Sequence, residues 1–300
     1  MERVQLADDL SFSRIIHGLW RLNEWNHTPE DTLDLMEYCL ELGITTFDHA
    51  DIYGGFLNEE LFGKVLALKP ELRSKMELVT KCGIVFKSPR RPQHKSHHYD
   101  TSKKHILESV ENSLKNLQTD YLDTLLIHRP DPFMDPEQVA SAFLELKQAG
   151  KVRHFGVSNF KQHQYNMLQS YLDFNLVTNQ IELSAYVLEN FDDGTVNLCQ
   201  EKRVTPMAWS PLAGGKVFSS DEEKAKRLRT ALTKVAEELG ADGIDQVLYA
   251  WLLAHPATIL PIVGSGKKER IKKAVKALDY KLSLDQWFEI LHASMGYEVP

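Results

Sequence analysis

The alternation of short apolar runs with longer amphipathic segments, repeated along the whole chain, constrains the fold more than any other feature. Each run is four to six residues long, which is the length of a buried strand. The eight runs lie at residues 15–20, 44–47, 77–80, 122–127, 152–157, 176–181, 204–209 and 258–263. The pattern therefore predicts about eight strands, each separated from the next by helical sequence.

Helical periodicity fills the intervals between these runs. Thr28 is a helix-capping residue type, Pro29 suits the first helical position, and Gly43 follows the last apolar residue of the helical face. The same reasoning predicts helices at 58–68, 102–117, 136–149, 161–172, 188–201, 221–240, 244–254, 268–278 and 283–294. Regular alternation of strand and helix favours a parallel sheet covered by helices.

Two architectures fit such an alternation. A doubly wound nucleotide-binding sheet usually carries a glycine-rich turn after an early strand, and neither GxGxxG nor GxxxxGK[ST] occurs in this chain. A closed barrel accounts for eight strands without a domain boundary. We therefore predict the α/β class and a (β/α)8 TIM barrel, as a single domain over residues 1–300. An N-terminal β-hairpin at 4–6 and 11–13 and extra C-terminal helices complete it.

The only long irregular stretch is 85–101, VFKSPRRPQHKSHHYDT, which contains two prolines and is predicted to be a surface loop. It holds a group of histidines, His94, His97 and His98. A metal site would need a regularly spaced carboxylate or cysteine partner, and none is present, so we expect a polar loop and no metal.

Charge and cysteine content narrow the class of partner. The net charge of −7 and the pI near 6.0 give no general attraction to nucleic acid or to anionic membranes. The three cysteines, Cys39, Cys82 and Cys199, are far apart and show no paired spacing, so neither a disulfide framework nor a zinc site is indicated. No segment has the length of a membrane span. These observations predict a cytoplasmic, soluble protein without nucleic-acid or membrane partners.

Reactive and polar side chains gather where the predicted strands end. In a barrel, the loops that follow the carboxyl ends of the strands converge on one site. Any one of these residues is ordinarily just a solvated or structural side chain, but the joint pattern favours an active site. The residues are Asp48, Tyr53, Lys81, His128, Ser158, Asn159, Gln180, Trp209 and Ser210.

The sequence resembles the aldo-keto reductase family over nearly its whole length. Within that family the segments GLWRLNEWN and PIVGSGKKER are most similar to a group of bacterial oxidoreductases. The family segments, in the family's order and spacing, are FDHADIYG (47–54), LVTKCG (78–83), DYLDTLLIHRPD (120–131), FGVSNF (155–160), NQIELS (179–184), AWSPLAGG (208–215) and PIVGSGKKERI (261–271).

The resemblance implies a catalytic tetrad of Asp48, Tyr53, Lys81 and His128 and the reduction of carbonyl compounds to alcohols. Such a reaction needs a proton donor for the developing alkoxide and a polar group that holds the oxygen. Tyr53 can give the proton, and an ammonium at Lys81 would make it easier to lose. Asp48 would hold that ammonium, and His128 would donate to the carbonyl oxygen or relay protonation.

The resemblance also implies NADPH or NADP+ bound in an extended form across the carboxyl face of the barrel. The matching positions fall into four groups. They are Ser158, Asn159 and Gln180 for the carboxamide, Trp209 for the nicotinamide ring, Ser210, Pro211, Leu212, Gly214 and Lys216 for the pyrophosphate, and Gly264, Ser265, Gly266, Lys267 and Arg270 for the 2′-phosphate. Ala274 departs from the family, where many relatives have an adenine-binding asparagine.

The substrate is expected to be a small carbonyl compound or alcohol, handled by a monomer. Trp20, at the end of the first strand, and Trp25, in the loop beyond it, are candidates for the substrate pocket, although either can instead pack at the rim. Two other functions stay open. One is a cofactor-binding regulatory subunit, as in the potassium-channel β subunits of this fold. The other is a hydrolytic or isomerising barrel that uses Asp48 and Asp51 as paired carboxylates.

Overall fold

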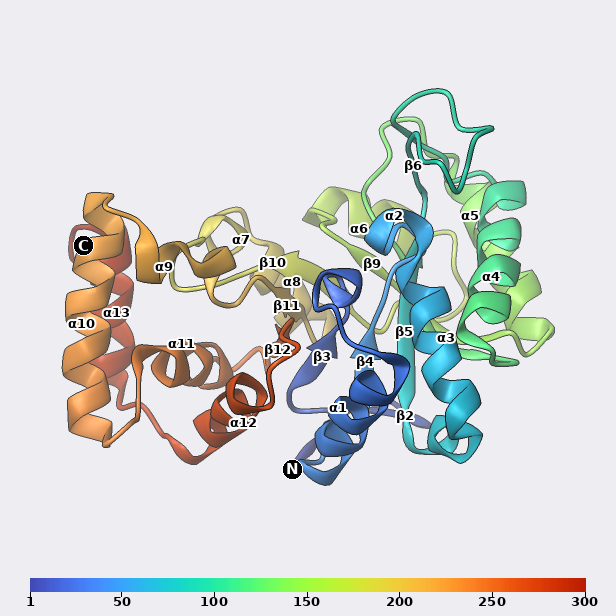
Figure 1. The fold of residues 1–300 in the computed structure, drawn as a ribbon. Helices are drawn as coiled ribbons and strands as arrows, with labels where there is room; N and C mark the ends of the chain where they lie inside the picture. Colours follow the sequence, from blue (N-terminus) through green and yellow to red (C-terminus); the bar gives the residue numbers. More distant parts are fainter. The chain divides into compact units, whose positions relative to one another are not determined.

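In the computed structural model, which describes residues 1–300, eight parallel strands form a closed barrel. Figure 1 shows the helices and strands coloured along the sequence. The strands follow one another around it in the order β10-β11-β12-β3-β4-β5-β8-β9. Their bounds are β3 (Ile16–Gly18), β4 (Thr46–Asp48), β5 (Glu77–Cys82), β8 (Leu122–Ile127), β9 (Val152–Ser158), β10 (Asn179–Glu182), β11 (Met207–Trp209) and β12 (Leu260–Val263). The predicted (β/α)8 barrel is confirmed.

Helices occupy the intervals between the strands, as predicted. Several begin with a side-chain cap: the Oγ1 of Thr28 accepts the Asp31 N–H at 3.1 Å before α1, and such a cap contributes about 1 kcal/mol. No helix combines the length and the apolar character that crossing a membrane requires. The helices are α1 (Pro29–Glu41), α2 (Tyr53–Phe56), α3 (Asn58–Leu68), α4 (Lys103–Leu117), α5 (Pro136–Gln148), α6 (Gln162–Gln169), α7 (Glu189–Asp192), α8 (Thr195–Lys202), α9 (Lys216–Ser219), α10 (Glu223–Leu239), α11 (Ile244–Leu253), α12 (Lys268–Lys276) and α13 (Leu284–Met295).

The chain divides into two compact units. One contains residues 1–179 with 264–266, and the other contains residues 180–263 with 267–300. The expectation of a single domain over the whole chain stays a prediction.

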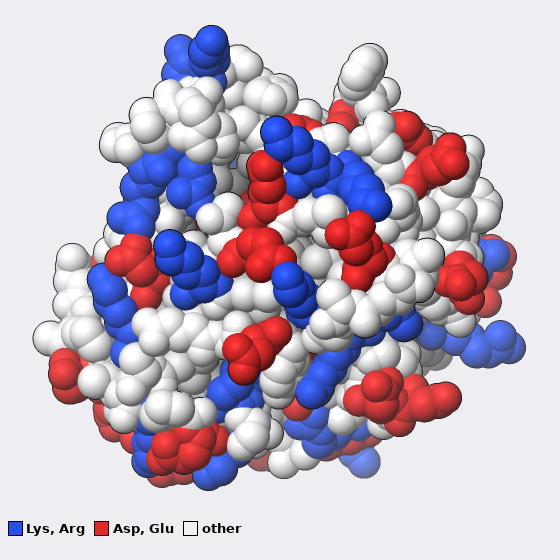
Figure 2. Space-filling view, turned by 90° about the vertical axis from the view of Figure 1, so that its right-hand side faces the viewer, with Lys and Arg blue, Asp and Glu red and all other residues white.

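The first unit begins with the predicted N-terminal hairpin, in which β1 (Arg3–Ala7) pairs antiparallel with β2 (Leu10–Ser13). On its outer face, basic and acidic side chains interleave (Figure 2). Some of them join neighbouring helices, as Lys103 of α4 does with Glu145 of α5 at 2.8 Å. Because such pairs are exposed, each contributes at most about 1 kcal/mol.

The second unit has its own core, built from the inner faces of α10, α11 and α13. Two indoles join α11 to α13: Trp251 and Trp287 stack with centroids 4.8 Å apart and planes 9° from parallel. Each ring N–H donates to the backbone carbonyl of the other residue, at 3.0 and 3.1 Å. The two buried donors are therefore satisfied without water.

Two expectations need correction. The predicted helix at 188–201 is two helices, α7 and α8, because the chain turns at Gly194, whose φ of +82° lies in the left-handed region. The irregular stretch 85–101 is partly ordered as a ribbon. In it, β6 (Ile84–Val85) pairs antiparallel with β7 (His98–Tyr99). Two-residue strands leave too little alternation to be predicted from sequence.

A buried histidine in the wall of the barrel makes the stability sensitive to acid. The His17 ring is fully buried, packs 5.9 Å from the ring of Phe47, and has no hydrogen-bond partner at either nitrogen. Burial lowers the pKa of His17 to about 4. Between that value and the ordinary value near 6.5, the unfolded chain binds a proton that the folded chain does not, so stability falls as the pH falls.

Replacement of His17 by phenylalanine is expected to remove this acid sensitivity. The difference in unfolding free energy between the variant and the wild type should shift by about 2 kcal/mol in favour of the variant between about pH 7.5 and about pH 5. Urea unfolding of both proteins at the two pH values measures it. Equal pH dependence of stability in the two proteins would show that folding does not shift the pKa of His17.

Candidate active site

Three neighbouring barrel strands deliver charged or polar side chains to their carboxyl ends. Asp48 is the last residue of β4, Lys81 lies near the end of β5, and His128 follows β8 directly. The strands are held in register there, because the His128 N–H donates to the carbonyl of Cys82 at 2.9 Å. Tyr53 begins α2, five residues after Asp48 in the sequence. The polar ends of the strands thus meet at one edge, as barrel geometry requires.

The Lys81 ammonium lies at the centre of this group and is completely buried. It donates to both carboxylate oxygens of Asp48 at 2.8 and 2.9 Å, to the backbone carbonyl of His49 at 2.6 Å, and to the hydroxyl oxygen of Tyr53 at 3.0 Å. A lysine has three N–H donors, so these three partners use all of them. Since the Tyr53 oxygen accepts from Lys81, its own O–H is left to donate to a different acceptor.

The electrostatics of the pair keep the lysine charged. Burial opposes the ammonium form of Lys81, but the Asp48 carboxylate and the Tyr53 oxygen outweigh it and raise the pKa of Lys81 above its usual value. For Tyr53, by contrast, burial itself is the main cause of the pKa shift. Burial raises the pKa of the phenol, Asp48 adds to this effect, and Lys81 opposes it.

The direction for Tyr53 corrects one expectation. Lys81 does pull toward the phenolate, as predicted, but desolvation outweighs that pull in the protein without ligands. The phenol of Tyr53 is therefore protonated at neutral pH. A group that carries its proton until an acceptor arrives is suited to act as a general acid.

The imidazole of His128 lies edge-on to the Tyr53 ring, with centroids 5.9 Å apart. Burial, the Lys81 charge and the Arg129 charge together hold the pKa of His128 well below its usual value, so the ring is neutral at neutral pH. Its Nδ1 is buried and has no partner in the protein. A neutral imidazole with a donor N–H at this position can bond an oxygen that is placed beside Tyr53.

The two other polar residues of the loop after β4 face away from this group. The His49 ring packs edge-on against Phe62 of α3, with centroids 4.4 Å apart, and both its nitrogens are buried without a partner. Burial and the neighbouring Glu59 raise the pKa of Asp51 well above its usual value. Because Asp48 is committed to Lys81 and Asp51 lies with Glu59, the arrangement disfavours a pair of carboxylates acting on one substrate.

The turn that carries Tyr53 has an unusual backbone. Three residues in succession, Gly54, Gly55 and Phe56, have φ values of +60°, +65° and +73°. The 85–101 loop holds the carbonyls of this turn: Ser88 Oγ donates to Gly55 O at 3.1 Å, and Arg90 Nε donates to Phe56 O at 3.0 Å. A left-handed Phe is strained, and these two contacts stabilise it.

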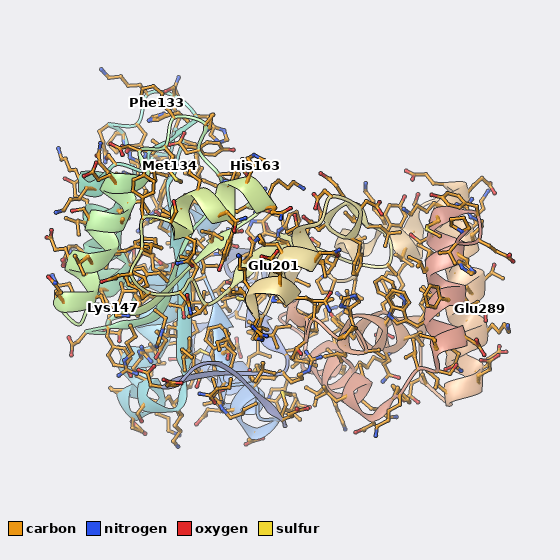
Figure 3. All side chains as sticks on the ribbon, turned by 180° about the vertical axis from the view of Figure 1, so that it is seen from behind. Phe133, Met134, Lys147, His163, Glu201 and Glu289 are labelled. Carbon is orange, nitrogen blue, oxygen red and sulfur yellow. The ribbon has the colours of Figure 1, made fainter.

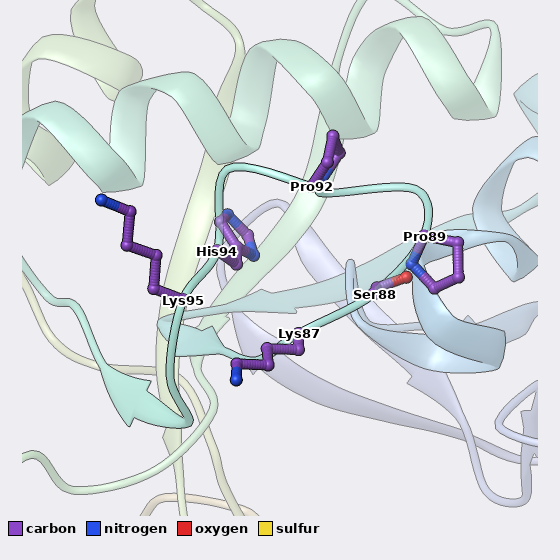
Figure 4. A pocket seen from close by; sticks show the side chains of 6 residues that line it. All are labelled: Lys87, Ser88, Pro89, Pro92, His94 and Lys95. Atoms are coloured by element: carbon purple, nitrogen blue, oxygen red, sulfur yellow. The ribbon is translucent and has the colours of Figure 1, made fainter.

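The same loop borders an open hollow of about 480 Å3 (Figure 4). Ser88, which bonds the Tyr53 turn, forms part of its wall. Its lining includes two ammonium groups and no carboxylate. The lining residues are Lys87, Ser88, Pro89, Pro92, His94 and Lys95. In the whole structure, no three histidine, cysteine, aspartate or glutamate side chains are placed to hold a metal ion.

The loop after β8 is tied to the loop before α4. Asp131 accepts from Thr101 Oγ1 at 2.8 Å and from the backbone N–H of Phe133 at 2.8 Å. Phe133 stands at the tip of this loop and points away from the barrel beside Met134, with 94% of its surface exposed (Figure 3). Asp131 thus fixes the base of the loop and leaves the tip in solvent.

The two tryptophans proposed for the substrate pocket have different surroundings. The Trp20 ring lies 6.4 Å from the Tyr53 ring and is 57% exposed, so it forms an open apolar wall beside that ring. Trp25 instead packs 5.7 Å from the ring of His17 and against Gly266, where a Cβ would come within 2.6 Å of the indole. Trp20 is therefore the one that lies beside Tyr53.

The cofactor candidates of the first unit lie at two strand ends. Ser158 is the last residue of β9 and is buried, and the Asn159 amide donates to its hydroxyl at 2.8 Å. The segment from Gly264 to Gly266 follows β12, and a Cβ on Gly264 would meet nothing closer than 3.9 Å. The Trp25 indole packs directly against Gly266 of that segment.

The cofactor candidates of the second unit are a buried amide and two turns. Gln180 lies on β10 with 2% of its surface exposed. After Trp209, at the end of β11, Ser210 and Ala213 have φ values of +51° and +50°, followed by Gly214 at +63°. Pro211 and Leu212 lie within this turn and Lys216 begins α9 after it. Lys267 occupies the position before the first residue of α12, and Arg270 is exposed in the first turn of that helix.

One polar residue beside Tyr53 was not predicted to be part of the site. Asn58 was treated only as the start of a helix, yet it is 1% exposed and bonds the backbone of the Trp20 loop. The signal in the sequence was a polar residue three positions after the glycine pair that follows Tyr53, at the first position of the predicted helix.

Comparison with known proteins agrees with this geometry. The profile of the Aldo/keto reductase family matches residues 14–294. Over 300 residues, and over 100% of both chains, the chain is 67% identical to uncharacterized oxidoreductase YcsN of Bacillus subtilis (strain 168). It is 51% identical over 301 residues to oxidoreductase YdhF of Escherichia coli (strain K12) and 45% identical over 300 residues to a 6-dehydroglucose reductase of Agrobacterium fabrum, again over 100% of each chain.

The fold comparison gives the same answer. A thermostable aldo-keto reductase, Tm1743, solved in complex with the inhibitor epalrestat, superposes with a TM-score of 0.82 at 28% sequence identity. The match covers 98% of this chain and 100% of that one. With the closed barrel, the full-length relatives and the matched profile taken together, the chain belongs to the aldo/keto reductase family of oxidoreductases.

Proposed function

We propose that this oxidoreductase reduces aldehydes or ketones to alcohols with NADPH, and that Tyr53 protonates the carbonyl oxygen. The observation that carries the proposal is the set of hydrogen bonds from Lys81 to Asp48, His49 O and the Tyr53 oxygen. These bonds hold the Tyr53 oxygen as an acceptor and leave its O–H to donate. A carbonyl oxygen placed beside Tyr53 would also come within reach of the neutral His128 ring. Two donors would then meet the developing alkoxide.

The residues present fit a dinucleotide. The nicotinamide, when bound, would supply the hydride. Ser158, Asn159 and Gln180 offer hydroxyl and amide groups that suit its carboxamide, and Trp209 offers an aromatic face. The turn after β11, with its successive positive φ values, suits close approach of a pyrophosphate to the backbone. Lys267 and Arg270 at the start of α12 suit a 2′-phosphate, which the helix N-terminus also favours.

Replacement of Arg270 by alanine is expected to raise the NADPH dissociation constant by about tenfold or more, because hydrogen bonds to charged groups contribute roughly 1.5–3 kcal/mol. NADH lacks the 2′-phosphate and should lose little affinity. Quenching of tryptophan fluorescence measures both dissociation constants. Lys272→Ala, an exposed cation two residues further along α12, is the control. Equal losses for NADPH and NADH in Arg270→Ala would mean that Arg270 does not bind the 2′-phosphate.

For the substrate we propose a polyhydroxylated aldehyde. The full-length relatives named 6-dehydroglucose reductase, at 45% and 38% identity, support a sugar aldehyde. The exposed indole of Trp20 beside Tyr53 supports it as well, since an aromatic face suits the apolar face of a sugar ring. The three buried cysteines form no disulfide, which fits a reducing compartment, and we propose a cytoplasmic monomer.

A substrate panel tests the proposal. Purified protein with NADPH is mixed with 6-dehydroglucose, glyceraldehyde, an aromatic aldehyde and a simple ketone, and the absorbance of the reduced nicotinamide is followed. We expect the largest kcat/KM for the sugar aldehyde. Binding of NADPH without turnover of any carbonyl compound would contradict the proposal and favour the regulatory alternative.

A further inference from the structure

Asn58, at the start of α3, contacts both the loop of Trp20 and the turn that carries Tyr53. Its side chain is almost completely buried, and its amide nitrogen donates to the carbonyl of Leu19 at 2.9 Å and to that of Trp20 at 2.8 Å. Both N–H donors of the amide are thus used on one short piece of chain. The orientation of the amide follows from these two bonds, since its oxygen would repel the same carbonyls.

These bonds matter because the contacts of the Trp20 indole itself are too few to determine its orientation. With 57% of its surface in solvent, the ring has few contacts, among them the Tyr53 ring at 6.4 Å and the Arg21 guanidinium at 5.4 Å from its centroid. Its backbone is held instead: the Leu19 N–H donates to the carbonyl of Asp48 at 3.0 Å, and Asn58 holds the next two carbonyls. The direction in which the indole leaves the barrel therefore depends on Asn58.

The other end of the same amide touches the turn of the proton donor. A Cβ built on Gly54 would come within 2.0 Å of Asn58 Oδ1, so the glycine that follows Tyr53 packs directly on this side chain. Ser88 and Arg90 bond the carbonyls of the next two residues of that turn. The left-handed run is therefore contacted both by Asn58 and by the 85–101 loop.

We propose that Asn58 is a positioning residue that sets the separation between the Trp20 indole and the Tyr53 hydroxyl, and so determines which carbonyl compounds reach the proton donor. The inference rests on the proposed reductase function. Asn58 does not touch Lys81 in the bonds described, so the acid itself keeps its lysine partner. The effect is on placement, and small errors of placement reduce rates steeply.

Asn58→Ala is expected to lower kcat/KM for 6-dehydroglucose by between about tenfold and about a hundredfold. The variant should lower kcat/KM for glyceraldehyde much less, because this substrate is too small to contact both the Trp20 indole and the turn of Tyr53. KM should rise for the larger substrate, while the NADPH dissociation constant and the pH dependence of kcat stay at their wild-type values. Asn112→Ala is the matched control, because Asn112 is exposed on α4 and bonds only its own helix, at Glu108 O.

Two further variants separate positioning from general stability. Gly54→Ala drives a Cβ into Asn58 Oδ1 and should reproduce the change in substrate preference with Asn58 still present. In a Trp20→Ala background, Asn58→Ala should raise KM little further. Equal losses for both substrates with unchanged KM, or additive effects of Trp20→Ala and Asn58→Ala, would overturn the inference.

A crystal structure of Asn58→Ala gives a readout that does not depend on turnover. The distance between the Trp20 and Tyr53 rings, 6.4 Å in the wild type, should change, while the 3.0 Å contact between Lys81 and Tyr53 is kept. An unchanged ring separation would overturn the inference. A wild-type protein that reduces no carbonyl compound would instead remove the proposed function, and the ring separation would still decide the role of Asn58.

Discussion

Replacement of Tyr53 by phenylalanine is expected to lower kcat by about a hundredfold to ten-thousandfold, the usual contribution of a positioned general acid. The ring and its packing against His128 are kept, and only the hydroxyl is lost. Lys81 then loses one of its acceptors but keeps Asp48 and His49 O, so the fold should be retained. Steady-state kinetics measure the loss, and fluorescence quenching should show nearly unchanged NADPH affinity.

Tyr165→Phe is the matched control for that experiment. Tyr165 is buried and its hydroxyl donates to Leu176 O at 3.2 Å, so this variant also loses one buried hydroxyl but none beside Lys81. Its turnover should stay near that of the wild type. Unchanged turnover in Tyr53→Phe, or an equal loss in both variants, would rule out Tyr53 as the acid.

Replacement of Lys81 by methionine is expected to destabilise the protein by about 3–5 kcal/mol, because a buried carboxylate at Asp48 would lose its counter-charge. Turnover should fall to background, since Tyr53 would lose the group that orients its oxygen. Urea unfolding measures the first effect, and NADPH oxidation measures the second.

A double variant separates these two effects. Lys81→Met combined with Asp48→Asn removes both charges, and removing both partners of a buried pair is less destabilising than removing one. Stability should therefore recover in part, while turnover stays absent. A double variant as unstable as Lys81→Met alone would mean that the two side chains do not form the coupled pair described here.

Much of the barrel followed from local pattern. Each of the eight predicted strands overlaps a barrel strand, and the helix predicted at 58–68 has the bounds of α3, Asn58–Leu68. These features are encoded by apolar period and length over a few residues, together with caps such as Thr28. The positions of Asp48, Lys81 and His128 after successive strands likewise predicted that they would lie at one edge of the barrel.

The remainder depends on contacts between distant parts of the chain. The left-handed turn after Tyr53 is held by Asn58 and by Ser88 and Arg90, from positions 33 and 34 residues later in the chain than the carbonyls they bond. No local pattern indicates such bonds. The direction of the Tyr53 pKa was inferred from Lys81 alone, and the opposing desolvation becomes known only when the fold buries the phenol.

In the proposed reaction, NADPH adds a hydride to the carbonyl carbon and Tyr53 adds a proton to the carbonyl oxygen. The most direct test supplies NADPH that carries deuterium as the transferable hydrogen at C4 of the nicotinamide, together with 6-dehydroglucose. With the wild type, mass spectrometry and NMR of the product should show one deuterium on the newly formed carbinol carbon. Tyr53→Phe should form almost no labelled alcohol in the same time. Absence of the alcohol, or an alcohol without deuterium, would contradict the account.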